Sequence, residues 1–191
     1  KLLSETRRKE QVDAGKTLGL KDVVFLGHED SLLEPTMELR HDITREIRRH
    51  RPDVLICQYP LRSFGENSST VGHPDHIAAG EATLSATYPT ARDHMSFPNL
   101  LEEGLEPHKV AEVWIMWPPE PDLWIDVTNH IEKAIAALQK HSSQLGNHNK
   151  TESEKWMRDK RSQCAIGKNM DYAEAYKRIV LEHGRGSFTS I

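Results

Sequence analysis

Two histidines and an aspartate lie within the five-residue segment Gly72-His73-Pro74-Asp75-His76, and they are the strongest candidates for chemistry in this chain. Neutral imidazole is the commonest metal ligand and a ready acid or base near neutral pH. A carboxylate between the rings could orient one of them through its ring N–H. The segment follows an apolar run, Val54 to Cys57, and opens a run of helix formers. It is therefore expected at the mouth of a strand-loop-helix unit, where open α/β sheets bind their ligands.

The position of Pro74 indicates how the two histidines are presented. Proline suits the first position of a helix, so His73 is expected at the cap and His76 in the first turn. Residues three apart share a helix face, so both rings could reach one point in space. The alternative is a proline-started helix with two solvent-facing histidines. The spacing alone does not decide between them, because zinc needs at least three protein ligands.

Composition restricts the class of protein. The chain has 191 residues, a net charge of -4 and 37% hydrophobic residues, which indicates one globular domain. Without a clustered basic surface, no nucleic-acid partner is expected. No apolar run approaches the roughly 20 residues of a membrane span. Cys57 and Cys164 lack metal or redox spacing, which indicates reduced thiols and a cytoplasmic protein.

Hydrophobic periodicity predicts alternating strands and helices. The expected strands are Val23–Leu26, Val54–Cys57, Val110–Trp117 and Trp124–Val127. The expected helices are Lys1–Leu18, Thr36–His50, Ile77–Ala86, a short helix within Phe97–Gly104, a helix capped by Thr128, and two weaker ones, Glu152–Cys164 and Asp171–Leu181. In the helix Thr36–His50, the buried face is expected to carry Met37, Ile43 and Ile47. This order predicts an α/β, Rossmann-like fold with a mostly parallel sheet flanked by helices.

Six segments together resemble one family, the zinc-dependent de-N-acetylases of the PIG-L or LmbE-like group. The matching segments are Arg7-Arg8-Lys9-Glu10, Leu18–Gly27, Arg51-Pro52-Asp53-Val54, Gly72–His76, His141-Ser142-Ser143-Gln144 and Tyr172-Ala173-Glu174-Ala175. They cover nearly the whole chain in register. The resemblance implies a single LmbE-like domain over residues 1–191, with residues 146–191 as a C-terminal helical tail.

The resemblance also implies a role for five residues. His76 corresponds to a zinc ligand, and His73 to the residue that polarises the substrate carbonyl and stabilises the oxyanion. Asp75 would hold His73 in orientation. Arg7 matches an arginine that contacts a sugar hydroxyl, although a solvated helix charge is an equal alternative for it. Asp30 is a weaker match to an acidic substrate-binding residue.

The chain departs from the family at one motif. The family's opening strand ends in Ala-His-Pro-Asp-Asp-Glu, which supplies a histidine and an aspartate to the zinc ion and an aspartate as general base. Nothing in this sequence matches that motif, so one of three expected ligands is present. The remaining ligands are expected from an upstream strand-helix-strand segment. The chain by itself is expected to hold zinc weakly or not at all and to be inactive as an amidase. It is also expected to self-associate, as a possible homo-oligomer, or to be poorly stable.

The function that the resemblance implies is zinc-dependent hydrolysis of an amide. The substrate would be a small molecule containing an N-acylated, most simply N-acetylated, amino sugar. One alternative is an amidase that acts on a bulkier thiol or sugar conjugate. Another, from a different class, is a metal-free ligand-binding or scaffold module. The upstream motif would distinguish the enzyme from the binding module.

Overall fold

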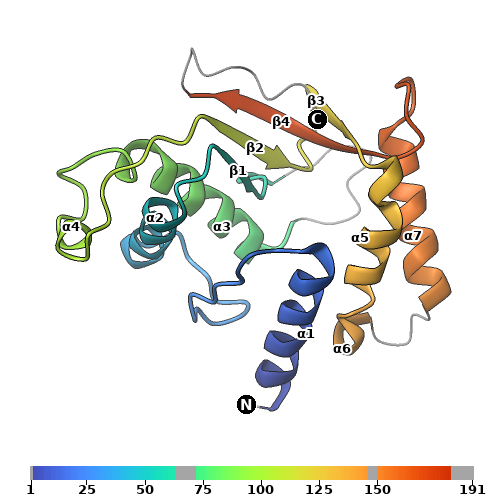
Figure 1. Ribbon diagram of the computed structural model, residues 1–191, viewed down its shortest axis with the longest axis horizontal. Coiled ribbons are helices and arrows are strands. Elements are labelled where there is room, and N and C mark those ends of the chain that lie inside the picture. Colours follow the sequence, from blue (N-terminus) through green and yellow to red (C-terminus); the bar gives the residue numbers. More distant parts are fainter. Residues whose placement is uncertain (1, 63–71, 146–149, 182–191) are drawn as a thin grey trace. The chain divides into compact units, whose positions relative to one another are not determined.

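The computed structural model describes residues 2–62, 72–145 and 150–181 (Figure 1). Its contacts divide the chain into two compact units. The first unit combines residues 1–25 with 124–174, and the second combines residues 26–123 with 175–191. The described strands form a sheet in the order β1-β2-β4-β3, and the borders of the units fall within β3 (Leu123–Asp126) and β4 (Ala173–Val180).

The second unit is built on two parallel strands. β1 (Val54–Cys57) pairs with β2 (Glu112–Met116) in the register Val54↔Glu112 to Cys57↔Ile115, and β4 runs antiparallel to β2 on its other side. The helices α2 (Met37–His50) and α3 (Pro74–Ser85) pack beside these strands (Figure 1). Their shared core contains Ile47, Cys57, Ala86, Ala91, Val110, Val113 and Ile115. The turn Ala86–Thr90 and the short helix α4 (Asn99–Glu102) complete the unit.

The first unit is mainly helical. α1 (Leu2–Leu18) packs against α5 (Ile131–Leu138), and α5 packs against α7 (Lys150–Cys164). Its core consists of Ile131, Ile135 and Met157, covered by Leu138 and Tyr172. The short helix α6 (Ser142–Leu145) contacts α1, and a 3-10 turn, Thr128–His130, precedes α5.

The α/β fold predicted from the sequence is confirmed, with a mixed rather than mostly parallel sheet in the described residues. The difference comes from Asp171–Leu181, for which the helix prediction was wrong. This segment forms β4 because Tyr176 and Ile179 pack against the buried side chains of β2. Strand pairing with β2 therefore outweighs the helix propensity of the segment. The predicted C-terminal helical tail is therefore wrong for residues 173–180, while residues 146–149 and 182–191 lie outside the described structure.

Three smaller predictions were also wrong. Val23–Leu26 forms no strand, because no described strand pairs with it. Met37 is 58% exposed, so the buried face of α2 begins at Leu39 instead. Thr128 does not cap α5; its hydroxyl accepts hydrogen bonds from the backbone N–H groups of Asp171 and Tyr172, which anchors the entry to β4.

No helix among residues 2–62, 72–145 and 150–181 has the length and apolar character needed to cross a membrane.

Candidate functional site

The helix α3 is brought against the carboxyl end of β1 by a glycine. A Cβ atom at Gly80 would lie 2.5 Å from the carbonyl oxygen of Gln58, so only glycine permits this approach. β1 and β2 are parallel, so their carboxyl ends meet at one edge of the sheet. The first turn of α3 therefore presents its side chains at the edge where α/β sheets bind ligands.

His73 is the N-cap of α3, as predicted, and Pro74 occupies the first turn. The ring Nδ1 of His73 accepts a hydrogen bond of 3.2 Å from the backbone N–H of Asp75. A neutral imidazole has one donor and one acceptor nitrogen. Because Nδ1 is the acceptor, the ring proton is assigned to Nε2. His73 therefore offers an N–H donor from a side chain that is 46% exposed.

His76 lies in the first turn of α3, beside His73. The ring centroids of the two histidines are 5.3 Å apart, and the ring planes are inclined at 38°. Both residues are exposed. Within the described ranges, no group of three His, Cys, Asp or Glu side chains could hold a metal ion. The pair is thus an incomplete set for zinc, which requires at least three protein ligands.

Asp75 makes a contact that the sequence did not indicate, and its role in orienting His73 stays a prediction. Its Oδ2 accepts a hydrogen bond of 2.7 Å from the backbone N–H of Ser31. Its Oδ1 is buried, lies 3.9 Å from His73 Nδ1 and has no hydrogen-bond partner among the described residues. The His73 ring is thus oriented by the backbone of Asp75, while the carboxylate holds the loop that contains Ser31.

The two predicted substrate-binding residues lie in different units. Asp30 belongs to the loop Gly27–Leu33 of the second unit and directly precedes Ser31, so the Asp75 contact brings its loop to the start of α3. Arg7 lies on α1 in the first unit. The second unit therefore assembles His73, Asp75, His76 and the Asp30 loop, and the role of Arg7 stays a prediction.

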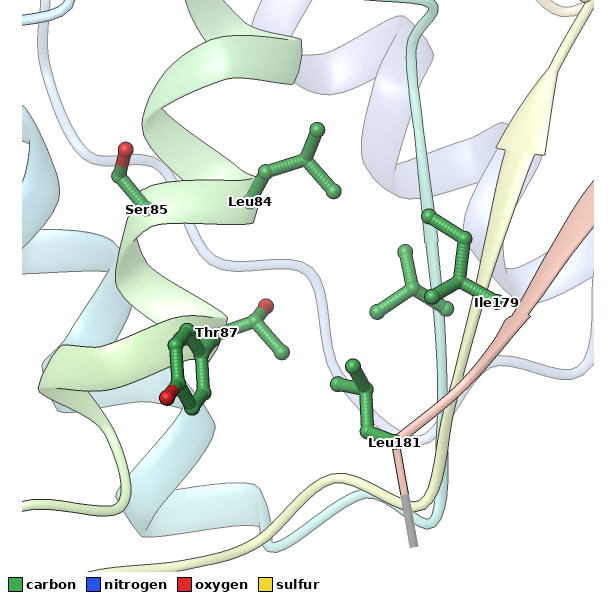
Figure 2. Close-up of a pocket in the computed structure, with 7 residues that line it drawn as sticks. Leu84, Ser85, Thr87, Ile179 and Leu181 are labelled. Atoms are coloured by element: carbon green, nitrogen blue, oxygen red, sulfur yellow. The ribbon is translucent and has the colours of Figure 1, made fainter.

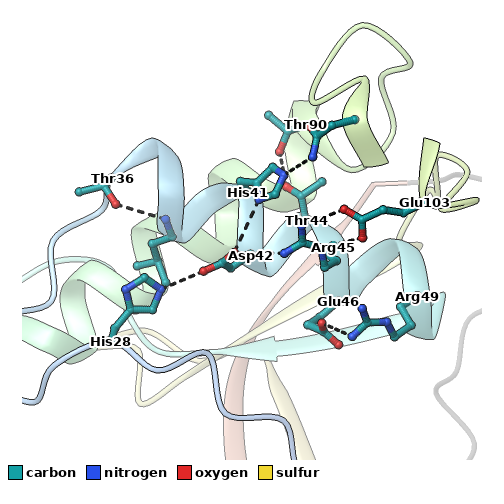
Figure 3. Close-up of polar contacts among 12 residues, drawn as sticks. His28, Thr36, His41, Asp42, Thr44, Arg45, Glu46, Arg49, Thr90 and Glu103 are labelled. Carbon is teal, nitrogen blue, oxygen red and sulfur yellow. Dashed lines mark hydrogen bonds and ion pairs between the residues drawn. The ribbon is translucent and has the colours of Figure 1, made fainter. Parts of the chain in front are cut away.

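Sequence reasoning missed the polar residues of α2 that hold neighbouring loops. Asp42 Oδ2 lies 3.2 Å from His28 Nε2 (Figure 3). Arg48, only 2% exposed, donates hydrogen bonds to the backbone carbonyls of Thr90, Ala91, Asp93 and Ser96. Burial of the guanidinium lowers the pKa of Arg48. One feature of the sequence could have indicated these contacts: α2 has few apolar residues and carries polar residues spaced three or four apart.

Two of the segments that resemble the family, one containing Glu10 and one containing Ser142 and Ser143, meet in the first unit. The buried carboxylate of Glu10 accepts hydrogen bonds from the Ser142 hydroxyl (3.0 Å), the Ser143 N–H (2.7 Å) and the Ser143 hydroxyl (2.7 Å). These bonds, chiefly that of the Ser143 hydroxyl, hold the pKa of Glu10 below its ordinary value. The contact is therefore a structural link between α1 and α6.

A pocket of about 270 Å³ lies in the second unit, between the C-terminal end of α3 and β4 (Figure 2). Leu84 and Thr87 face Ile179 and Leu181 across it. The lining is mainly apolar and contains none of the predicted site residues. Because His73 starts α3 and this pocket adjoins its other end, the pocket is separate from the candidate site.

Comparison of the sequence with protein families matches residues 1–87 to the PIG-L family, described as GlcNAc-PI de-N-acetylase. Among curated proteins, the chain is 28% identical over 143 residues to the diacetylchitobiose deacetylase of Thermococcus kodakarensis, covering 75% of this chain and 51% of that protein. It is 29% identical over 141 residues to a probable N-acetyl-alpha-D-glucosaminyl L-malate deacetylase 2 of Bacillus anthracis, covering 73% and 56%. The chain thus spans about half the length of these relatives.

Solved structures show the same fold at lower identity. The N,N'-diacetylchitobiose deacetylase of Pyrococcus horikoshii superposes with a TM-score of 0.81 at 23% identity, over 98% of this chain and 68% of that one. The 4-carboxy-2-hydroxymuconate hydratase GalB of Pseudomonas putida superposes with a TM-score of 0.69 at 18% identity, over 95% and 74%. Proteins with different activities therefore share this fold.

Proposed function

Residues 1–87 of this chain match the PIG-L family, and from this premise we propose that the protein removes the N-acetyl group from an amino sugar or a small molecule that contains one. The curated relatives are deacetylases of diacetylchitobiose and of a glucosaminyl malate, which supports an N-acetylated glucosamine unit as the common substrate element. The observation that carries the proposal is the start of α3, where two imidazoles lie side by side within the matched residues.

In this reaction His73 would act on the carbonyl oxygen of the acetamide. Its Nδ1 is engaged by the backbone, so its Nε2–H is the donor that is directed to the substrate. Water adds to the carbonyl carbon, the C–N bond breaks, and the nitrogen takes up a proton to leave as the free amine beside acetate. A hydrogen bond at the carbonyl oxygen stabilises the negative charge that develops when water adds.

His76 is proposed as one zinc ligand, with the other ligands coming from outside the described residues. Bound zinc would lower the pKa of a coordinated water and so supply hydroxide near neutral pH. His76 is suited to this role because it is exposed and has its ring beside the carbonyl-polarising residue. The described residues alone do not complete the metal site.

The fold by itself does not select this chemistry, since a hydratase shares it. The family match and the two curated relatives favour deacetylation. An amidase that acts on a bulkier conjugate would use the same residues and would differ in substrate preference. A metal-free binding module would bind the sugar without releasing acetate.

The test is release of acetate by the intact protein, after dialysis and with zinc restored, from N-acetylglucosamine and N,N'-diacetylchitobiose. Formation of an equal amount of free amine is expected. The variant His76→Ala should lose both bound zinc and activity, whereas Glu81→Gln, an exposed change on the same helix, should retain both. Zinc is measured by atomic absorption. No acetate from either sugar by zinc-loaded protein would rule out the proposed function.

A further inference from the structure

The loop Gly27–Leu33 is joined to the candidate site through its backbone. Ser31 N–H donates to Asp75 Oδ2 at 2.7 Å, and Asp75 is two residues from the His73 cap. The side chain of Asp75 is 15% exposed, and its carboxylate is the acceptor of this bond. Hydrogen bonds to charged groups are stronger than those between neutral groups. The bond therefore holds the loop at the start of α3, next to the His73 cap.

The backbone of the loop is irregular. None of its residues belongs to a helix or strand, and both Gly27 and Ser31 have left-handed backbone conformations, with φ of 87° and 70°. For serine this conformation costs roughly 1 kcal/mol. The Asp75 bond is made at that residue, so it offsets the cost and fixes one end of the loop.

The other end is held by a second carboxylate, on α2. Asp42 Oδ2 lies 3.2 Å from His28 Nε2, and the two side chains are 22% and 25% exposed (Figure 3). Asp42 Oδ1 lies 3.6 Å from His41 Nδ1 and 3.5 Å from Arg45 Nη1, which keeps this carboxylate in place. Arg45 is in turn held by both carboxylate oxygens of Glu103, at 2.9 and 3.0 Å.

We propose that His28 and Asp42 are positioning residues for substrate binding, which clamp the loop Gly27–Leu33 against α2 so that it forms one wall of the site beside His73. The clamp acts through the loop and not on the reacting atoms. This proposal rests on the proposed function, because it assigns the loop Gly27–Leu33 to the side of the site that would bind the sugar. Its effect is therefore on substrate affinity more than on turnover.

The test compares His28→Ala with Glu46→Gln in the intact protein. Both changes remove a polar contact made by α2, but only the first detaches the loop. With N,N'-diacetylchitobiose, His28→Ala should raise KM roughly 10-fold, the scale of one hydrogen bond to a charged group, while kcat stays within about twofold. His28→Gln keeps an N–H donor for Asp42 and should restore most of the affinity. Glu46→Gln, which breaks the pairs of Glu46 with Arg49 and His50, should leave both constants unchanged.

Amide hydrogen exchange of the peptide that contains Ser31 gives a second measurement that does not depend on activity. Exchange should be faster in His28→Ala than in the wild type, and unchanged in Glu46→Gln. Unchanged exchange in His28→Ala would overturn the clamp, and faster exchange with an unaltered KM would overturn its role in substrate binding. If the wild type releases no acetate, the proposed function fails. The inference is then tested by measuring the binding of diacetylchitobiose by calorimetry in place of KM. Equal affinities of the wild type and His28→Ala would overturn the inference.

Discussion

At the scale of single residues, His73 uses its two ring nitrogens for different purposes. Nδ1 caps α3 by accepting the Asp75 N–H, and Nε2 is left as an exposed donor. One substitution would therefore change both helix stability and catalysis. The two effects can be separated because asparagine is also a good N-cap but has no imidazole.

For this reason we expect His73→Ala and His73→Asn to differ in stability but not in activity. His73→Ala should lose about 1 kcal/mol of unfolding free energy, the usual value of an N-cap, and His73→Asn should lose little. Both should lower kcat by roughly 100-fold to 1,000-fold, the scale for one oxyanion-stabilising donor. Denaturant unfolding and acetate release are the measurements. Full activity in both variants would show that His73 is a solvent-facing cap and nothing more.

At the scale of elements, β4 is fixed to β2 by a buried ion pair. Arg178 Nε donates to Glu112 Oε2 at 2.7 Å, and its Nη2 donates to Oε1; the same carboxylate accepts the indole N–H of Trp114. Glu112 is 3% exposed, and Arg178, followed by the Trp114 bond, holds the pKa of Glu112 below its ordinary value of 4.5. The pair thus fixes the register of a strand that local propensity did not indicate.

Glu112→Gln should therefore lower the free energy of unfolding by about 2 kcal/mol at pH 7, less than the loss of a fully buried pair because Arg178 is partly exposed. The pKa of Glu112 is lower in the folded state than in the unfolded state. The carboxylate therefore contributes fully to the free energy of unfolding above the unfolded-state pKa, and this contribution is lost as the pH falls through the folded-state pKa. The difference in free energy of unfolding between the wild type and Glu112→Gln should shrink below about pH 4.5.

The control variant is Lys177→Met, which removes the half-exposed Lys177–Asp122 ion pair at another residue of β4. It should change the free energy of unfolding by less than roughly 1 kcal/mol.

In the first unit, the contact between α1 and α6 depends on Glu10. We expect Glu10→Gln to lower the melting temperature at pH 7, because the carboxylate accepts from Ser142 and Ser143. The pKa of Glu10 is lowered in the folded state, so this difference should disappear in acid, below the ordinary value of 4.5. Glu5→Gln, an exposed change on the same helix, is the control. Equal melting of both variants across this pH range would contradict the structural role of Glu10.

At the scale of the whole molecule, no further strand pairs with β1 among the residues that the structure describes. β1 is the terminal strand in the order β1-β2-β4-β3, and Ile56 on it is 49% exposed. Unpaired strand edges with apolar side chains tend to pair with other chains, and a charged residue at the edge prevents this. The self-association expected from the sequence therefore has a specific surface in the structure.

Residues 1–191 expressed alone should self-associate in a concentration-dependent manner, and Ile56→Lys should reduce this association. Sedimentation velocity at several concentrations is the measurement. Leu2→Lys, at an apolar residue that is 79% exposed on α1, is a matched control and should leave the association unchanged. A wild-type chain that remains monomeric at high concentration would show that this edge does not mediate association.

The sequence determined the features that depend on local chemistry. Pro74 after His73 specified the start of α3 and the capping position, and the apolar run Val54–Cys57 specified β1. Periodicity also gave α1 and α2 closely, with Gly19 and Thr36 at their ends. These signals are local because helix caps, proline and glycine act on the backbone within a few residues.

Tertiary structure alone decided the contacts between distant segments. The segment Ala173–Val180 became a strand through pairing with β2, and Val23–Leu26 remained irregular without a described partner. Asp75, which lies beside His73, also binds Ser31, which is 44 residues away. Likewise, nothing near His28 in the sequence indicates that Asp42 will meet it. Such partners are selected by the packing of whole elements, which brings a donor and an acceptor together regardless of their spacing in the chain.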